Sequence, residues 1–173
     1  MFLKIILPFI IGFLFQSPNF DSTTSSVTYG MRHKLHAWEG TSNQVNVAAK
    51  WNEKKQLDKI VVLVKVSSFN SGLSSRDSHM LEVLDAFTHP NITFSSTQIA
   101  YTNEGILAKG KLQFHGVTKD VQTVVKVLQI NNRIEFSGSF PILLEDYKVT
   151  RPSLLFVKAD NEVSIRFKCV FVE

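Results

Sequence analysis

The feature that most constrains this fold is the alternation of apolar and polar side chains along residues 106–115. Ile106, Leu112 and Phe114 share one parity, and the intervening positions carry mostly lysine, glutamine and histidine. Successive side chains of a β-strand point to opposite faces, so a period of two predicts a strand with one apolar face. The same period recurs in residues 133–142, which places Phe136 and Phe140 on the apolar parity.

About eight or nine segments with strand-like composition follow one another, and short polar turns separate them. Thr102–Gly105 and the pair Asn131–Asn132 are typical of tight hairpins. Strands and helices do not alternate regularly, so we predict an antiparallel all-β fold. The period alone fits a two-sheet sandwich or a closed barrel equally well.

One short amphipathic helix is predicted inside residues 66–96, after the β-branched run 59–66. Ser75 or Asp77 is placed to accept a hydrogen bond from its first turn. His89–Pro90 should end it, because proline disfavours helical conformation in the residue before it. The helix is interpreted either as a plug at one end of the sheet or as a lid over a cavity. Its apolar face is predicted to comprise Met80, Leu81, Leu84 and Phe87.

The N-terminal segment 1–15 contains Lys4 followed by eleven apolar residues, a length typical of a secretory signal. Residues 19–26 are polar and rich in serine and threonine, which predicts a linker. We therefore assign residues 1–24 to a signal peptide and linker, and 25–173 to one domain. This assignment predicts a periplasmic or secreted protein.

The composition favours a bulky apolar interior, with 44% hydrophobic residues and 14 phenylalanines among 173 residues. The net charge is +4, but the basic residues are scattered, which argues against nucleic-acid binding and leaves weak peripheral membrane contact open. The single cysteine, Cys169, shares the parity of apolar neighbours and is predicted to be a core residue. The oligomeric state is left open, with a homodimer among the states considered.

Two stretches of the chain resemble the YceI-like family of lipocalin-like polyisoprenoid-binding proteins. The first runs from Ser67–Gly72 through Arg76–Leu81 to His89–Ser96, and the second is the segment GKLQFHGVTK at 110–119. A weaker third match covers Phe140–Ile142, Asp146–Tyr147 and Arg151–Pro152. The resemblance implies a barrel of about eight strands with the helix capping one end. It also implies an elongated pocket for a polyisoprenoid or a related amphiphile such as a quinone.

The candidate ligand-binding residues combine inward-parity strand positions with the helix and its flanks. Arg76 and His79 are the polar groups nearest the helix, and Arg76 could bind a phosphate or carbonyl head group or instead hold its own loop. No catalytic residue, metal or permanent cofactor is predicted. The full candidate set is Val64, Phe69, Arg76, His79, Met80, Leu84, Phe87, Phe94, Leu112, Phe114, Phe136 and Phe140.

Three other functions were weighed against lipid binding. A hydrolase built on Asp77, His79 and the nearby serines is disfavoured, because residues two apart on a helix point in different directions. A metal site at His33 and His36 is disfavoured, because this spacing on one continuous strand points the rings to opposite faces. A structural or stress-response barrel acting through protein partners would have a filled interior and an exposed apolar patch.

Overall fold

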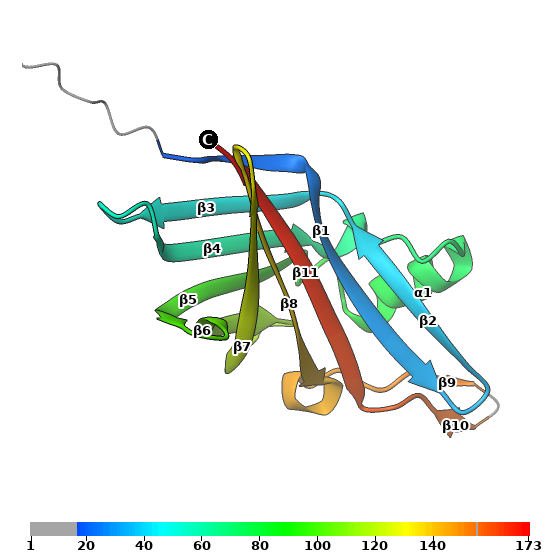
Figure 1. Cartoon of the computed structure of the whole chain (residues 1–173). Coiled ribbons are helices and arrows are strands. Elements are labelled where there is room, and N and C mark those ends of the chain that lie inside the picture. The colour runs from blue at the N-terminus through cyan, green and yellow to red at the C-terminus, as the bar shows by residue number, and fades with distance from the viewer. Residues whose placement is uncertain (1–16, 155) are drawn as a thin grey trace, which may run out of the picture.

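The fold is one curled antiparallel sheet, seen in a computed structural model that describes residues 17–154 and 156–173 (Figure 1). Nine strands are hydrogen-bonded in the order β2-β1-β11-β8-β7-β6-β5-β4-β3, and the short strands β9 and β10 form a separate pair. The predicted antiparallel all-β barrel is confirmed. The strands are β1 (Asn19–His33), β2 (His36–Ser42), β3 (Val45–Trp51), β4 (Leu57–Lys65), β5 (Asn91–Thr102), β6 (Gly105–Phe114), β7 (Val117–Ile130), β8 (Arg133–Leu143), β9 (Ser153–Leu154), β10 (Val157–Lys158) and β11 (Glu162–Val172).

The sheet curls so far that the first part of β1 contacts the edge strand β3 without forming a ladder (Figure 1). The connection across this seam is an isolated bridge between Thr41 and Asn70, whose backbone N–H groups and carbonyls bond reciprocally at 2.9 and 3.0 Å. Asn70 follows the short helix η1 (Val66–Ser68), which comes directly after β4. The chain after β4 is therefore hydrogen-bonded to β2 at this point.

Two buried serines repair the ladder where strands change register. Between Asp21 and Ser26 of β1 the register shifts, and Ser25 Oγ there accepts the Val170 N–H at 3.0 Å. In β5 the register shifts between Ser96 and Gln98, and Ser96 Oγ accepts the Ile60 N–H at 2.9 Å. A buried backbone N–H without a partner is costly, so these hydroxyl groups allow the sheet to bend without that penalty.

The predicted linker at residues 19–26 is wrong, because this segment is the first part of β1. Phe20 pairs with Phe171 of β11, and their rings meet edge to face at 5.5 Å. The sheet therefore begins ahead of the predicted domain boundary at residue 25. The predicted signal sequence at 1–15 lies outside the described residues. Within the described part of the chain, no helix is long and apolar enough to cross a bilayer.

The chain turns where the sequence predicts one continuous strand through His33 and His36. Lys34 and Leu35 form a turn that separates β1 from β2. His33 and His36 are consequently paired across a hairpin, with ring centroids 5.8 Å apart, rather than pointing to opposite faces. Further along, β9 and β10 pair with each other, whereas β11 lies between β1 and β8.

The helix α1 (Ser74–Val83) lies at one end of the curled sheet, beside β2 (Figure 1). No side chain caps its N-terminus, so the predicted cap by Ser75 or Asp77 is wrong. The Asp77 carboxylate instead accepts the Ser71 N–H at 3.1 and 3.2 Å and fixes the loop before the helix. At the opposite corner of the same end, the short helix η2 (Leu144–Tyr147) follows β8.

Inward-facing apolar side chains form the core, as the alternation predicted. In β6, Ile106, Ala108, Gly110, Leu112 and Phe114 are buried, while the intervening positions are partly or fully exposed. Cys169 of β11 is also buried and free, which agrees with its predicted place in the core.

Candidate functional site

The middle of the curled sheet contains a cavity of about 120 Å³, here called the barrel cavity. Its walls are almost entirely hydrocarbon, supplied by the inward parities of seven strands. About 10–15 Å³ suffices for one water molecule, and apolar cavities of this kind bind apolar ligands. The lining residues include Val27, Leu57, Ile60, Val62, Ile92, Ile99, Ile106, Ala108, Val125, Ile165 and Cys169.

Gly110 in β6 shapes this cavity, because the absence of a side chain there leaves room for the ring of Phe94. A Cβ atom at Gly110 would stand 2.5 Å from Cε2 of Phe94 and 2.5 Å from the Ser95 carbonyl oxygen. Such a distance is shorter than any tolerated contact, so only glycine fits here. Phe94, from the neighbouring strand β5, therefore occupies the space above Gly110 and forms part of the cavity wall.

A second cavity of about 130 Å³ lies between α1 and the β1–β2 hairpin, here called the helix-side cavity. Met80, Val83 and Leu84 line it from the helix, and Met31 and Trp38 line it from the hairpin. Met31 and Trp38 are cross-strand partners in the register of β1 and β2, which is why both reach the same space.

The two cavities adjoin each other. Ile92 at the start of β5 and Ile165 in β11 line both of them. These two residues therefore mark the boundary between the cavities, and a slender ligand that passed them would occupy both. Together the cavities describe an elongated apolar space that runs from α1 into the middle of the sheet.

The walls of both cavities are almost entirely hydrocarbon, but the residues that line the helix-side cavity include Arg76 and His79, whose polar groups lie close to it. The Arg76 guanidinium lies 5.6 Å from the ring centroid of Trp38, within cation–π range, and donates a long 3.5 Å hydrogen bond to the Ser71 carbonyl. His79 is largely exposed, and its Nδ1 lies 3.6 Å from the Glu82 carboxylate. Burial raises the pKa of Tyr29, which keeps its hydroxyl neutral on the same wall.

Of the two roles predicted as alternatives for Arg76, the structure shows the loop contact, because its guanidinium donates to the Ser71 carbonyl ahead of α1. Arg76 is also among the residues that line the helix-side cavity, and its contact with a head group stays a prediction. Among the described residues Arg76 forms no ion pair, so its positive charge is not neutralised by a carboxylate in contact with it. A planar guanidinium in this position suits a phosphate or carbonyl group at the end of an apolar ligand.

The structure distributes the predicted site residues between the two cavities. Five line the barrel cavity: Val64, Phe94, Leu112, Phe136 and Phe140. Six line the helix-side cavity: Phe69, Arg76, His79, Met80, Leu84 and Phe114.

Phe87 lines neither cavity, so its predicted place on the apolar face of the helix is wrong. The helix ends at Val83, and Asp85 adopts a positive φ of 41°, which turns the chain before Phe87. The Phe87 side chain is 99% exposed as a result. The apolar face of α1 consists of Met80, Val83 and Leu84, which have the i, i+3, i+4 spacing of one helix face. Val83 therefore belongs to this face in place of Leu81 and Phe87.

The barrel cavity also reaches the surface at a slot between β7 and β8. The first part of β7, up to Val125, pairs with β6, and only the part from Lys126 onward pairs with β8. β7 and β8 are therefore not hydrogen-bonded as a ladder before Lys126. Gln122 has an exposed side chain and still lines the cavity, which places an opening here. A hydrogen bond from Thr123 Oγ1 to the Ser139 carbonyl, 2.9 Å long, spans the slot.

The polar groups around the helix do not converge as a hydrolytic triad would require. The Asp77 carboxylate binds the Ser71 backbone, while His79 is directed to Glu82. Within the described residues, no three histidine, cysteine, aspartate or glutamate side chains are grouped so that they could hold a metal ion. Burial raises the pKa of Cys169 to about 12, so its thiol stays protonated and is a poor nucleophile.

The sequence profile of the YceI-like domain matches residues 19–171. The chain belongs to the YceI-like family. A UPF0312 protein of Pectobacterium carotovorum is 28% identical over 134 residues, which cover 72% of this chain and 70% of that protein. The protein YceI of Salmonella newport is 26% identical, with the same coverage of 72% and 70%.

Solved structures show the same fold at low sequence identity. BcnA of Burkholderia cenocepacia superposes with a TM-score of 0.79 at 23% identity, covering 88% of this chain and 99% of that one. A polyisoprenoid-binding domain from Saccharophagus degradans, implicated in plant cell wall breakdown, gives a TM-score of 0.71 at 13% identity, covering 90% and 98%. This YceI-like chain is therefore related in fold to a domain that binds polyisoprenoids.

Proposed function

We propose that this YceI-like protein binds an isoprenoid-type amphiphile, such as a polyprenyl lipid or a quinone, without catalysing a reaction on it. The observation that carries the proposal is the pair of adjoining apolar cavities. Both offer hydrocarbon walls for a tail, and Arg76 and His79 are among the residues of the helix-side cavity, where we place the head group. The relation in fold to a polyisoprenoid-binding domain supports this class of ligand.

The energetics suit reversible binding. Each buried methylene contributes ~0.8 kcal/mol, so about ten buried carbons contribute ~8 kcal/mol. This corresponds to roughly micromolar affinity before the cost of ordering the ligand is subtracted. The alternative of a structural barrel predicts an interior without a cavity, so the two cavities favour ligand binding over it.

The proposal is tested by native mass spectrometry and solvent extraction of protein purified without denaturation. We expect a copurified lipid whose mass fits a prenyl chain, and displacement of a bound polyene fluorophore by prenyl phosphates or quinones. Protein that carries no lipid and binds no such fluorophore would contradict the proposal.

We further propose that the chain is exported to the periplasm or secreted. The support is the apolar segment at residues 5–15, which follows Lys4 and has the length of a signal sequence. Mass spectrometry of protein from separated cell fractions tests this. We expect a shortened N-terminus in the extracytoplasmic fraction, and an intact Met1 on cytoplasmic protein would refute export.

A further inference from the structure

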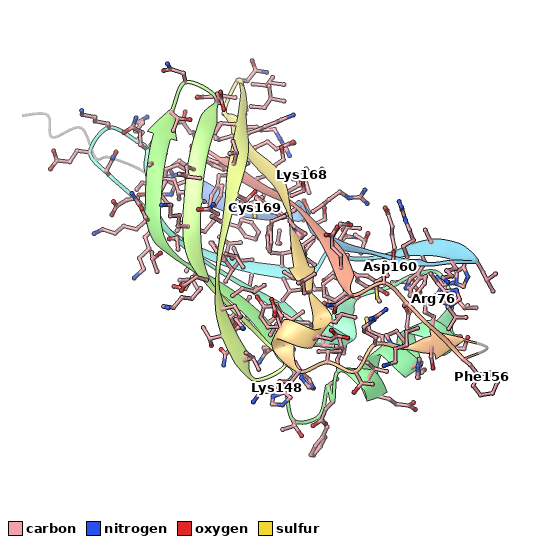
Figure 2. All side chains as sticks on the ribbon, turned by 90° about the horizontal axis from the view of Figure 1, so that it is seen from below. Arg76, Lys148, Phe156, Asp160, Lys168 and Cys169 are labelled. Atoms are coloured by element: carbon pink, nitrogen blue, oxygen red, sulfur yellow. The ribbon has the colours of Figure 1, made fainter. Side chains whose placement is uncertain are left out.

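Two neighbouring hairpin turns carry exposed apolar side chains beside the helix-side cavity. Leu35, in the turn between β1 and β2, is 66% exposed. Phe156, in the turn between β9 and β10, is fully exposed and points away from the molecule (Figure 2). Transfer of an exposed Phe side chain from water to an apolar phase is favourable, and exposed apolar side chains grouped on one surface mark interaction sites.

The two turns are fixed next to each other by hydrogen bonds. His33 Nε2 lies 3.0 Å from the Val157 carbonyl oxygen, and the Asp160 N–H donates to the Arg32 carbonyl at 2.8 Å. His33 is two residues from Leu35, and Val157 adjoins Phe156. The β1–β2 turn and the β9–β10 pair accordingly lie together in Figure 1, far from the start of β1.

Exposed cations surround these apolar tips. Arg32, Lys34 and Lys158 are all exposed, and none of them forms an ion pair with another described residue. Asp160 and, at the start of β11, Glu162 are exposed carboxylates close to this region, and the three cations outnumber them. An anionic leaflet attracts each nearby Lys or Arg, and lysine stems can lie along the interface while their heads stay in water.

We propose that these two turns form a docking surface for an anionic lipid bilayer, with Leu35 and Phe156 inserting and Arg32, Lys34 and Lys158 contacting phosphates. We call these five residues the tip surface. The hairpin that carries Leu35 also supplies Met31 and Trp38 to the helix-side cavity, so docking places that cavity beside the membrane. The docking surface goes beyond the proposed lipid binding, because it is measured whether or not the cavities are filled.

A second apolar strip on β7 fits a bilayer less well. Its exposed members, Val124, Leu128 and Ile130, lie in the second half of β7, which ends at the β7–β8 turn. This turn is far from the tip surface (Figure 1). The nearby Arg133 is paired with Asp21 at 3.4 Å, so the strip offers Lys126 to lipid phosphates, whereas the two turns offer Arg32, Lys34 and Lys158. This strip provides the matched control for the experiment.

The test places an environment-sensitive NBD fluorophore at either end of the molecule, through Leu35→Cys or Ile130→Cys. Cys169 is buried with a raised pKa, so the label attaches at the introduced cysteine. The labelled protein, expressed from the full-length sequence, is mixed with vesicles of phosphatidylglycerol and phosphatidylethanolamine. A second sample is mixed with vesicles of phosphatidylcholine. We expect a blue-shifted, stronger emission at position 35 with the anionic vesicles alone. A response at 130 instead, at neither position, or equally with phosphatidylcholine overturns the proposal.

Charge variants test the electrostatic part of the same surface. Lys34→Gln combined with Lys158→Gln should lower the partition coefficient about 25-fold, since each cation near an anionic surface contributes about a factor of five. The matched pair Lys59→Gln and Lys126→Gln removes the same net charge from exposed strand positions and should change partitioning little. An equal loss in both pairs would show that net charge, and not the tip surface, attracts the protein.

Discussion

The two cavities differ in what their walls can recognise. The barrel cavity is lined mostly by aliphatic and phenylalanine side chains on the hydrogen-bonded strands of the sheet, with the slot between β7 and β8 as an opening. The helix-side cavity is bounded partly by α1 and a hairpin, and it adds an arginine, a histidine, a tyrosine and a tryptophan. Both cavities therefore suit apolar ligands, and the second differs in having charged side chains among its lining residues.

The largest expected effect comes from placing a charge in the wall of the helix-side cavity. Phe114→Asp replaces a buried ring that packs 5.4 Å from Tyr147 with a carboxylate. We expect ligand affinity to fall more than about 100-fold, because a buried charge without a partner is costly. Fluorophore displacement measures the loss, and circular dichroism verifies the fold. Phe114→Leu is the control and should retain binding; a folded Phe114→Asp that binds normally would remove Phe114 from the site.

The next effect tests the barrel cavity by filling it. Ala108→Leu adds three carbons to an inward position of β6 that lines this cavity. If it displaces about three methylenes of the tail, affinity should fall about 50-fold, at ~0.8 kcal/mol per methylene. Titration with ligands of long and short chain measures this, and a short-chain ligand held in the helix-side cavity should be unaffected. Equal loss for both lengths would mean that the tail does not enter the barrel.

A smaller effect tests the polar groups of the helix-side cavity. Arg76→Gln removes the guanidinium while keeping a polar side chain, and should weaken binding of a prenyl phosphate about tenfold. A neutral quinone of equal tail length should bind as before. Arg166→Gln, which removes an exposed arginine paired with Glu39, is the matched control. Equal loss for phosphate and quinone would show that Arg76 supports the loop without contacting the head group.

The smallest effect compares access of water to the two cavities. Burial raises the pKa of the Cys169 thiol to about 12, so its thiolate fraction stays low from pH 7 to 9 and increases as the pH approaches that value. We expect slow reaction of native protein with a disulfide reagent and rapid reaction in denaturant. In His79→Cys, a thiol at the exposed rim should react at once. Fast labelling of native Cys169 would contradict a dry barrel cavity.

The sequence predicted the sheet well because its signal is periodic. In β6 every second residue is buried, and any other register would expose Ile106, Leu112 and Phe114 together. The β1–β2 hairpin was missed because Lys34 and Leu35 include no glycine, asparagine or proline, and neither residue has a positive φ. Missing this turn also hid Trp38, which reaches the helix-side cavity only because β2 folds back on β1.

The site was predicted in part for a similar reason. Inward parity located the strand residues of the barrel cavity, but parity does not reveal whether facing side chains meet or leave space. The end of the helix was placed too late, since Pro90 is a strong stop signal while Asp85, which turns the chain earlier, is an ordinary residue in sequence. Phe87 was therefore assigned to the apolar face of the helix, although the helix ends at Val83, before Phe87 is reached.

The slot between β7 and β8 bears on how this protein treats ligands of different size. A closed vessel would impose a maximum on the number of prenyl units, and affinity would collapse beyond it. Here the far end of a tail can emerge beside Gln122 once the interior is full, at the expense of the hydrogen bond between Thr123 and Ser139. Under the proposed function, affinity should accordingly rise with chain length and then level off, so that one protein would accept a whole homologous series of lipids.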